Sequence, residues 1–449
     1  MKYFFSKSRN CGIPLSTGAA GKNTAPPRAL TGYRLDRVLY VAVLALIAAM
    51  CTSGVAWAML WLLRLISSVA FTGQFSFDTV RPDKHELGVW VIGVPVAGAL
   101  IILAMERLSL ALTRHTVTGS PLQQSNSQRF LQVLKHFPSI IAMGTGSPLG
   151  PEGPAMDAGS ALGRWMGGLF DISANETKVL MVAASTSAVA FVFGAPIAAV
   201  VLAAELWMVE FSLLSGVSVL LAALAGATFR QMFWSPAPLF VIPAITEPQL
   251  IDLLFYTIVG LVTGVMAGLL VRAEGLVHSL FARMSLRPYW WPVIGAVLVG
   301  VIGYFEPATF GPGYYQARTI LNGNITFHLV IVLIVFKFLS WLFAQASGTP
   351  GGSIFPLIVM GAALGVLLTA LLQFTFRGVE LNVYIAAIIG MAAMFAGASR
   401  AWVAAVVFAL EATRSPNALL PLALACTAAY FSAYLFLKKQ TTPTQTSAQ

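Results

Sequence analysis

The sequence is poor in charged residues, cysteine and histidine. Asp, Glu, Lys and Arg make up 10% of its 449 residues, whereas 57% are hydrophobic and the mean hydropathy is +0.80. Soluble domains carry about 25% charged residues, so this composition excludes a soluble protein and indicates many membrane segments. The three cysteines (Cys11, Cys51, Cys426) are far apart and the five histidines are isolated. We therefore expect no disulfide framework, no metal site and no cofactor.

Acidic residues are especially scarce at the two ends of the chain. Residues 1–37 carry seven Lys or Arg and one acid, and the last apolar segment is followed by Lys438 and Lys439. The positive-inside rule then predicts that both termini are cytoplasmic. Residues 1–34 are rich in Gly, Pro, Ser and Thr and are expected to form a flexible basic tail. Because the tail has no interleaved aromatic residues, we interpret it as a topology signal and expect no nucleic-acid binding.

One acidic residue, Glu152, lies in an apolar stretch that cannot be an uninterrupted helix. Residues 144–163 read GTGSPLGPEGPAMDAGSALG, with Pro148, Pro151 and Pro154 around the acid. Prolines remove backbone donors, and irregular backbone at membrane depth is tolerated where it lines a cavity or is buried in protein. We expect a helix to begin at Pro154 and run to about Phe170. Its free N–H groups would form an anion site in which Glu152 competes with the anion.

The same pattern recurs 202 residues later. Residues 346–365 read ASGTPGGSIFPLIVMGAALG and match residues 144–163 at eight positions, and APIAAVVLAAE at 195–205 matches AWVAAVVFALE at 401–411 at an offset of 206. Two related halves, each with a broken helix, are typical of transport proteins whose half-helix N-termini face an anion near the middle of the membrane. Two Gly-rich packing helices are the alternative. Packing explains the glycines, but it explains neither the prolines nor Glu152.

We place the repeat halves at about 35–235 and 247–437, within one membrane domain at 35–437 that is followed by a short cytoplasmic tail at 438–449. Several of the apolar runs, such as 130–143 and 400–412, have fewer than 18 residues. They are too short to cross a membrane upright, so we expect re-entrant or tilted helices.

Four segments resemble the CLC family of chloride channels and chloride/proton antiporters. They are GPEGP at 150–154, FGAPIAAVVLAAE at 193–205, SGTPGGSIFP at 347–356 and AGASRAWVAAVVFALEAT at 396–413. They occur in the family's order, and the resemblance covers about residues 35–437. It implies an all-α integral membrane fold of two inverted-topology repeats with broken and tilted helices, and no CBS domains. Within the family, the chain resembles the bacterial ClcB-type branch of voltage-gated chloride channels.

The resemblance also assigns roles to individual residues. It implies a homodimer with one anion pore per subunit, in which Glu152 is the gate. Backbone N–H groups of Gly153, Ile354 and Phe355 would bind chloride. Lys135 would raise the local anion concentration, although a snorkelling interfacial lysine is an equal alternative. Desolvation and a neighbouring anion both disfavour ionisation of the gate, so we expect gating to respond to external acid.

The chain also departs from the family's pattern. Antiporters of the family carry two consecutive acids where this chain has Glu205 and Leu206. Leucine cannot relay a proton, and Glu210, the nearest substitute, is equally well explained as a solvated helix end. Ser120 is a weak candidate for the family's chloride-binding serine, because Gly-Ser-Pro here is also an ordinary turn. The family's inner-gate tyrosine has no counterpart after the last apolar segment.

These departures favour a chloride channel in the bacterial inner membrane, gated by Glu152, over a chloride/proton antiporter with weak or atypical coupling. A secondary transporter for organic anions is a more distant alternative, since neither broken loop contains an arginine. An enzyme is least favoured, because no paired acid, metal set or nucleophile accompanies Glu152. The expected partners are chloride and other small anions, protons, membrane lipid and a second copy of the chain. Lys337 also matches a basic position of the family, and we interpret it as structural.

Overall fold

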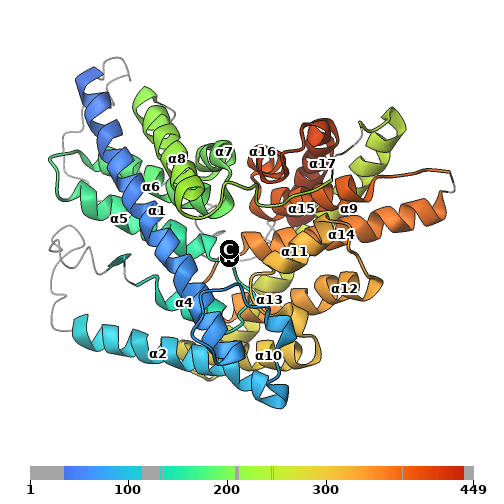
Figure 1. The fold of residues 1–449 in the computed structure, drawn as a ribbon, viewed down its shortest axis with the longest axis horizontal. Coiled ribbons are helices and arrows are strands. Elements are labelled where there is room, and N and C mark those ends of the chain that lie inside the picture. The colour runs from blue at the N-terminus through green and yellow to red at the C-terminus, as the bar shows by residue number, and fades with distance from the viewer. Residues whose placement is uncertain are drawn as a thin grey trace, which may run out of the picture. The chain divides into compact units, whose positions relative to one another are not determined.

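The computed structural model describes residues 35–113, 132–133, 135–207, 212–243, 245, 247–376 and 378–438. Helices dominate these residues, and their one β-type pairing is a bridge between Gly150 and Gly352 (Figure 1). Nine of the described helices or helical runs are long and apolar enough to cross a membrane. The all-helical membrane fold predicted from the sequence is therefore confirmed.

The described residues divide into two compact units, and the first comprises those within 1–59, 117–137 and 154–237. Its described helices are the first part of α1 (Leu35–Thr72), most of α5 (Glu152–Gly167), α6 (Ala174–Phe193), α7 (Pro196–Leu206) and α8 (Leu213–Phe233). Small side chains such as Ala49, Ala183 and Ala222 form its core. Small residues allow helix backbones to approach closely, which is how helices associate where water supplies no hydrophobic driving force.

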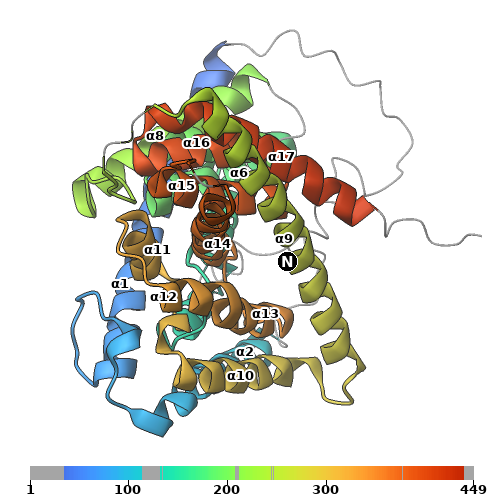
Figure 2. The same ribbon diagram turned by 90° about the vertical axis from the view of Figure 1, so that its right-hand side faces the viewer.

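The second unit comprises the described residues within 60–116, 138–153 and 238–449. Its shorter elements are η3 (Pro82–Lys84), η4 (Gly88–Ile92), α4 (Pro138–Gly144), η6 (Pro288–Trp290), η7 (Pro307–Thr309), α11 (Tyr314–Leu321), α12 (Phe327–Ile331), the π-helical turn η8 (Val332–Phe336), α13 (Lys337–Ala346) and η9 (Pro416–Ala418). Its longer helices are α2 (Gly93–Thr113), α9 (Leu250–Arg283), α10 (Trp291–Phe305), α14 (Ile354–Thr375), α15 (Val383–Ser399), α16 (Trp402–Thr413) and α17 (Leu419–Lys438). Both views show α2 and α10 side by side (Figures 1 and 2).

Two helices of the second unit, α4 and α13, end in the same way. Beyond α4, Ser147 N–H donates to Ala142 O (2.9 Å), and Gly146 between them has a φ of 106°. Beyond α13, Thr349 N–H donates to Ala344 O (3.2 Å), and Gly348 has a φ of 81°. These are Schellman caps, which favour glycine at the position of positive φ and a proline soon afterwards. The repeated Gly-Ser/Thr-Pro sequence is therefore a repeated helix stop.

A second repeated stop follows α6 and α15. Gly194 and Arg400 both adopt left-handed conformations, with φ of 67° and 61°. The next residues, Ala195 and Ala401, have similar dihedrals and are the N-caps of the short helices α7 and α16. This agreement supports the internal repeat at an offset of 206. The two short helices also agree with the expectation of segments that are too short to cross upright.

The predicted boundaries of the helix after the first loop were wrong by a few residues. We expected a helix from Pro154 to about Phe170, whereas α5 begins at Glu152 and ends at Gly167. A proline is tolerated throughout the first helical turn, because the N–H groups there have no intrahelical partner in any case. Glu152 is therefore the first residue of the helix, and it does not lie in the loop before it.

Candidate functional site: a carboxylate between paired loops

The two loops that follow the Schellman caps pair with each other. Gly150 N–H donates to Gly352 O (2.8 Å), and Gly352 N–H donates to Gly150 O (2.7 Å). Two reciprocal bonds hold residues 202 positions apart in one fixed register. Because α14 begins two residues after Gly352 and α5 begins two residues after Gly150, this pairing places the starts of both helices beside each other.

The Glu152 side chain occupies the N-terminus of α14. It is 1% exposed, and its Oε1 accepts hydrogen bonds from the N–H groups of Ile354 (2.8 Å) and Phe355 (3.2 Å). These are the first two residues of a 22-residue helix, whose unpaired N–H groups and dipole favour a negative charge. An oxygen of the protein thus lies at a site suited to a small anion.

The second oxygen of the same carboxyl group has different surroundings. Glu152 Oε2 is buried and has no hydrogen-bond partner among the described residues. A buried carboxylate oxygen without a donor is costly, and a proton on this oxygen would remove the buried charge. The geometry therefore provides one oxygen that is bonded to two N–H groups and one that can carry a proton.

Two glycines allow the carboxyl group to lie at this position. A Cβ on Gly150 or on Gly352 would overlap the Glu152 carboxyl group. The missing side chains let the acid lie against both loops. The Gly-rich character of the two loops thus follows from the close approach of the carboxylate as well as from the turns.

Lys337 supports the region behind the first loop. Its fully buried ammonium group donates to Thr309 O (2.8 Å) and to Gly311 O, and Gly311 N–H in turn donates to Gly146 O (3.0 Å). The lysine thus fixes a loop that is bonded directly to the first Schellman cap. Its interpretation as a structural residue is in accord with these contacts. The loop that supplies the two carbonyls was not predicted, although its sequence FGPG at 310–313 is a turn signal.

Aromatic rings pack against the same cap. Phe71 and Phe310 lie 5.5 Å apart between ring centroids, and both lie close to Gly146. His85 contacts both rings at 6.3 Å and 6.2 Å. Burial lowers the pKa of His85, so the imidazole is neutral at pH 7 and adds to this apolar packing. The backbone at Gly146 is held by packing on one side and by Gly311 on the other.

The remaining predicted site residues fall in several places. Gly153 packs on the second loop, where a Cβ would lie 2.9 Å from Gly352 N. Lys135 is exposed in a turn, and Glu205 is exposed near the end of α7. Ser120 and Glu210 lie outside the described residues. The structure thus brings Glu152, Ile354 and Phe355 together through hydrogen bonds.

Lys135 belongs to a small electrostatic group in the first unit. Burial lowers the pKa of His136, Asp157 on α5 raises it, and the adjacent Lys135 lowers it further. The lysine and an acid of the first turns of α5 therefore act on the same imidazole. This arrangement is compatible with either role predicted for Lys135.

Paired helix interruptions that direct N–H groups at a buried carboxyl group define a membrane transport protein with an anion site. Comparison with known proteins gives the family. The family model described as voltage gated chloride channel matches residues 113–434. The chain belongs to this CLC family of anion-transport proteins.

Individual relatives and solved structures agree with this assignment. The chain is 26% identical over 371 residues to the H(+)/Cl(-) exchange transporter ClcA of Vibrio campbellii. The matched region covers 78% of this chain and 79% of the relative. It is also 26% identical over 309 residues to the protein of the same name from Vibrio cholerae. This match covers 67% of this chain and 66% of the relative.

The fold is similar to that of a slow cyanobacterial Cl-/H+ antiporter, with a TM-score of 0.73, 21% identity and coverage of 92% of this chain and 100% of the other. It is also similar to a CLC-type fluoride/proton antiporter, with a TM-score of 0.71, 18% identity and coverage of 89% and 96%. The CLC-type fold predicted from the sequence is therefore confirmed. These matches do not select the ClcB-type branch, which stays a prediction.

Proposed function

We propose that this protein moves chloride across the bacterial inner membrane in exchange for protons, and that Glu152 is the group that opens and closes the anion path. The observation that carries the proposal is the bond pair from Ile354 and Phe355 to Glu152 Oε1. The names of the relatives, which are exchange transporters, favour exchange over the simple channel expected from the sequence.

The site supplies a physical link between the two ions. An ionised carboxylate accepts strong, charge-assisted hydrogen bonds from the two N–H groups. Protonation of Glu152 removes that charge, weakens both bonds and lets chloride take the N–H groups. Each movement of the side chain thus exchanges a bound carboxylate for a bound anion. Because desolvation and a nearby anion both disfavour the charged form, acid outside the cell should increase transport.

Passive chloride conduction is the second candidate, and one observation favours it. At the end of α7, Glu205 is followed by Leu206, where antiporters that the sequence resembles carry a second acid. A chain without this acid needs another route for protons from the inner side. Under this candidate Glu152 would gate chloride without carrying protons across.

We further propose that the protein is a homodimer with a complete anion path in each subunit, as its resemblance to the family implies. The acid and both donors of the site come from a single chain. Gly153 and Lys135 are proposed to act on the anion as well. The termini are proposed to be cytoplasmic on the basis of the basic residues at both ends.

The test is chloride efflux from proteoliposomes with a simultaneous pH readout. An outward chloride gradient should drive protons inward in the wild type, and Glu152→Gln should retain chloride efflux while proton movement and pH dependence are lost. Asp252→Asn, at the start of α9, is the control that should leave both unchanged. Chloride efflux without proton movement in the wild type would select the channel. An unchanged rate and pH dependence in Glu152→Gln would contradict both candidates.

A further inference from the structure

The proposed exchange needs a proton-carrying group on the cytoplasmic side of Glu152, and Leu206 at the end of α7 cannot bind a proton. Helix α9, which is long and apolar enough to cross a membrane, contains an acid in its second half. This acid, Glu274, is 8% exposed. A buried acid in an apolar helix is costly and by default marks an ion pathway. Glu274 was not predicted as a site residue, although an acid in an apolar stretch is the signal that indicated Glu152.

Glu274 lies on a face of α9 that packs against other helices of the unit. Buried residues recur along this part of α9 at spacings of three, four and seven positions, which places them on one side of the helix. They are Ala267, Leu270, Glu274 and Phe281. A Cβ on Gly397 of α15 would lie 2.9 Å from Ala267 Cβ, so this side faces α15. The acid is therefore directed at protein and away from lipid.

His278 lies one turn further along α9, where this helix passes the end of α13 (Figure 2). Residues four positions apart on a helix are neighbours, with about 5–6 Å between their Cβ atoms. His278 Nδ1 lies 2.9 Å from Ala346 O. Because a carbonyl oxygen only accepts hydrogen bonds, Nδ1 carries the proton of this bond and Nε2 is the acceptor nitrogen. The imidazole can therefore take up and release a proton at Nε2 while Nδ1 stays bonded.

Helix packing places this pair on the side of the chain where α17 ends. A Cβ on Gly260 would meet Ala425, and a Cβ on Gly268 would meet Phe436, so α9 and α17 run in the same direction. Helix α17 ends at Lys438, directly before the C-terminal tail that is proposed to be cytoplasmic. The second half of α9 is then on the cytoplasmic side, with the histidine nearer the cytoplasm than the acid.

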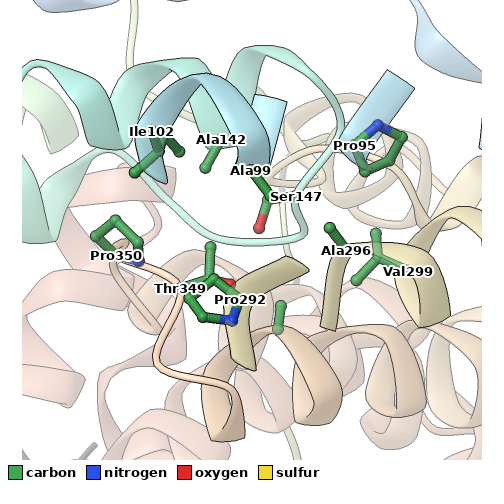
Figure 3. A pocket seen from close by; sticks show the side chains of 11 residues that line it. Pro95, Ala99, Ile102, Ala142, Ser147, Pro292, Ala296, Val299, Thr349 and Pro350 are labelled. Atoms are coloured by element: carbon green, nitrogen blue, oxygen red, sulfur yellow. The ribbon is translucent and has the colours of Figure 1, made fainter. Parts of the chain in front are cut away.

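Polar groups continue from the histidine to the loops of the site. Ala346, which His278 contacts, ends α13, and the next residue, Ser347, bonds through its Oγ to Thr349 Oγ1 (3.1 Å). Thr349 and Ser147 line a cavity of about 20 Å³, which is room for about one water molecule (Figure 3). Ser147 Oγ is buried and has no partner among the described residues. One water in this cavity would join the hydroxyl groups of the two loops.

Other charged groups on α9 and its neighbours are engaged elsewhere. Arg272, two residues before Glu274, lies on a different side of α9, where its guanidinium donates to Phe436 O and lies 3.7 Å from the centroid of that ring. Helices α14 and α15 contain no Asp, Glu, Lys, Arg or His. In α13 and α17 the only such residues are Lys337, at the far end of α13, and Lys438. The acid and the histidine are therefore the groups at this end of the bundle that can exchange protons.

We propose that His278 and Glu274 carry protons between the cytoplasm and Glu152, in place of the second acid for which this chain has Leu206. This inference rests on the proposed exchange of chloride for protons. His278 Nε2 takes a proton from cytoplasmic water and becomes an imidazolium, and the Glu274 carboxylate then receives that proton. The carboxyl group releases it to water beside the hydroxyl groups of the loops, and Glu152 Oε2 takes it up. Each step moves one proton and breaks no other covalent bond.

The test measures proton uptake driven by an outward chloride gradient in proteoliposomes, together with chloride efflux. Glu274→Gln keeps the shape of the side chain but cannot carry a proton, so proton uptake should fall about 10-fold or more while chloride efflux stays within about 2-fold of the wild type. His278→Gln can still donate an amide N–H to Ala346 O and should also lose proton uptake selectively. Glu274→Asp, which keeps a carboxyl group, should retain proton uptake. Asp252→Asn, at the other end of α9, is the matched control that should leave both fluxes unchanged.

Wild-type proton uptake in both Glu274→Gln and His278→Gln would overturn the relay and leave the exchange function intact. Equal losses of proton uptake in Glu274→Asp and Glu274→Gln would assign the acid a structural role and would overturn it as well. If Glu274→Gln does not fold, His278→Gln decides, because unchanged proton uptake in that variant contradicts the relay and a selective loss supports it. Absence of proton uptake in the wild type would contradict the exchange function, and the relay with it.

Discussion

At the residue scale, Glu152 Oε1 accepts hydrogen bonds from the two N–H groups that chloride would use under the proposed function, and the competition proposed there depends on what surrounds the acid. Oε1 has two donors and Oε2 has none among the described residues. The acid contacts glycine backbone on both sides, because any Cβ on Gly150 or Gly352 would overlap it. A single carbon added to either glycine should therefore change the occupancy of the site without altering its donors.

We predict that Gly352→Ala displaces the Glu152 carboxylate from the N-terminus of α14. An overlap worth about 1.4 kcal/mol changes occupancy tenfold, so chloride efflux at neutral pH should rise towards its value at acidic pH. The measurement is chloride efflux from proteoliposomes between acidic and neutral pH. The matched control is Gly216→Ala in α8, where a Cβ would meet no atom within 4 Å. A wild-type pH profile in Gly352→Ala would show that the carboxylate does not occupy this position.

At the scale of elements, the chain uses the same helix stop twice with different surroundings. The caps beyond α4 and α13 share the bonding pattern and a glycine of positive φ, at Gly146 and Gly348. A Cβ on Gly146 would lie 2.8 Å from the ring of Phe310, whereas a Cβ on Gly348 would meet nothing within 4 Å. Alanine substitutions at these two glycines therefore separate the effect of backbone strain on the free energy of unfolding from the effect of steric overlap.

We predict that Gly348→Ala destabilises the protein by about 1–2 kcal/mol, because a residue with a Cβ is strained at positive φ. Gly146→Ala carries the same strain and also overlaps a packed ring, so it should cost about 1–3 kcal/mol more. Thermal unfolding of the purified proteins in detergent measures both. Equal shifts in the two variants would mean that Phe310 moves freely away from the cap.

At the scale of the whole molecule, the compact units do not follow the repeat halves. The halves are contiguous in sequence, yet the described residues within 60–116 and 138–153 of the first half belong to the same unit as those within 238–449. The reason is that the first broken loop bonds to the second and α2 packs on α10. Neither half therefore contains a complete Glu152 site.

The orientation of the whole chain gives a further prediction. Helix α1 has 38 residues and reaches about 57 Å at roughly 1.5 Å per residue, which is enough to cross the membrane. With cytoplasmic termini, Phe75 beyond its end, which is 87% exposed, should face the periplasm. In a protein whose three cysteines are replaced by serine, Phe75→Cys should react with a membrane-impermeant maleimide in intact spheroplasts. Thr442→Cys in the C-terminal tail should react after lysis, and the reverse pattern would invert the topology.

Much of the site could be predicted from the sequence, because it depends on residue types with special backbones. Proline and glycine around an acid in an apolar stretch indicated Glu152. The second copy of that pattern indicated the region of Ile354 and Phe355. The exact start of α5 could not be predicted, since a proline is compatible with any position of the first helical turn.

Other features could not be predicted because they depend on distant partners. Nothing in the segment around Lys337 reveals that its ammonium group meets the carbonyls of Thr309 and Gly311. The packing of α2 on α10 likewise joins segments that are far apart in the chain, so neither segment reveals it alone. Spacing in the sequence reveals the repeat, but it does not reveal how close the two copies lie in the folded chain.

The sequence by itself determined that this protein lies in a membrane, that its chain contains two related halves, and where each half interrupts its helices. Composition determines the membrane location, the repeated segments reveal the two halves, and the local backbone chemistry of proline and glycine determines the interruptions. None of these three conclusions needs tertiary contacts. The tertiary structure decided which N–H groups bind Glu152 and that the two broken loops pair with each other. These depend on hydrogen bonds and packing between residues about 200 positions apart, which only the folded chain brings together.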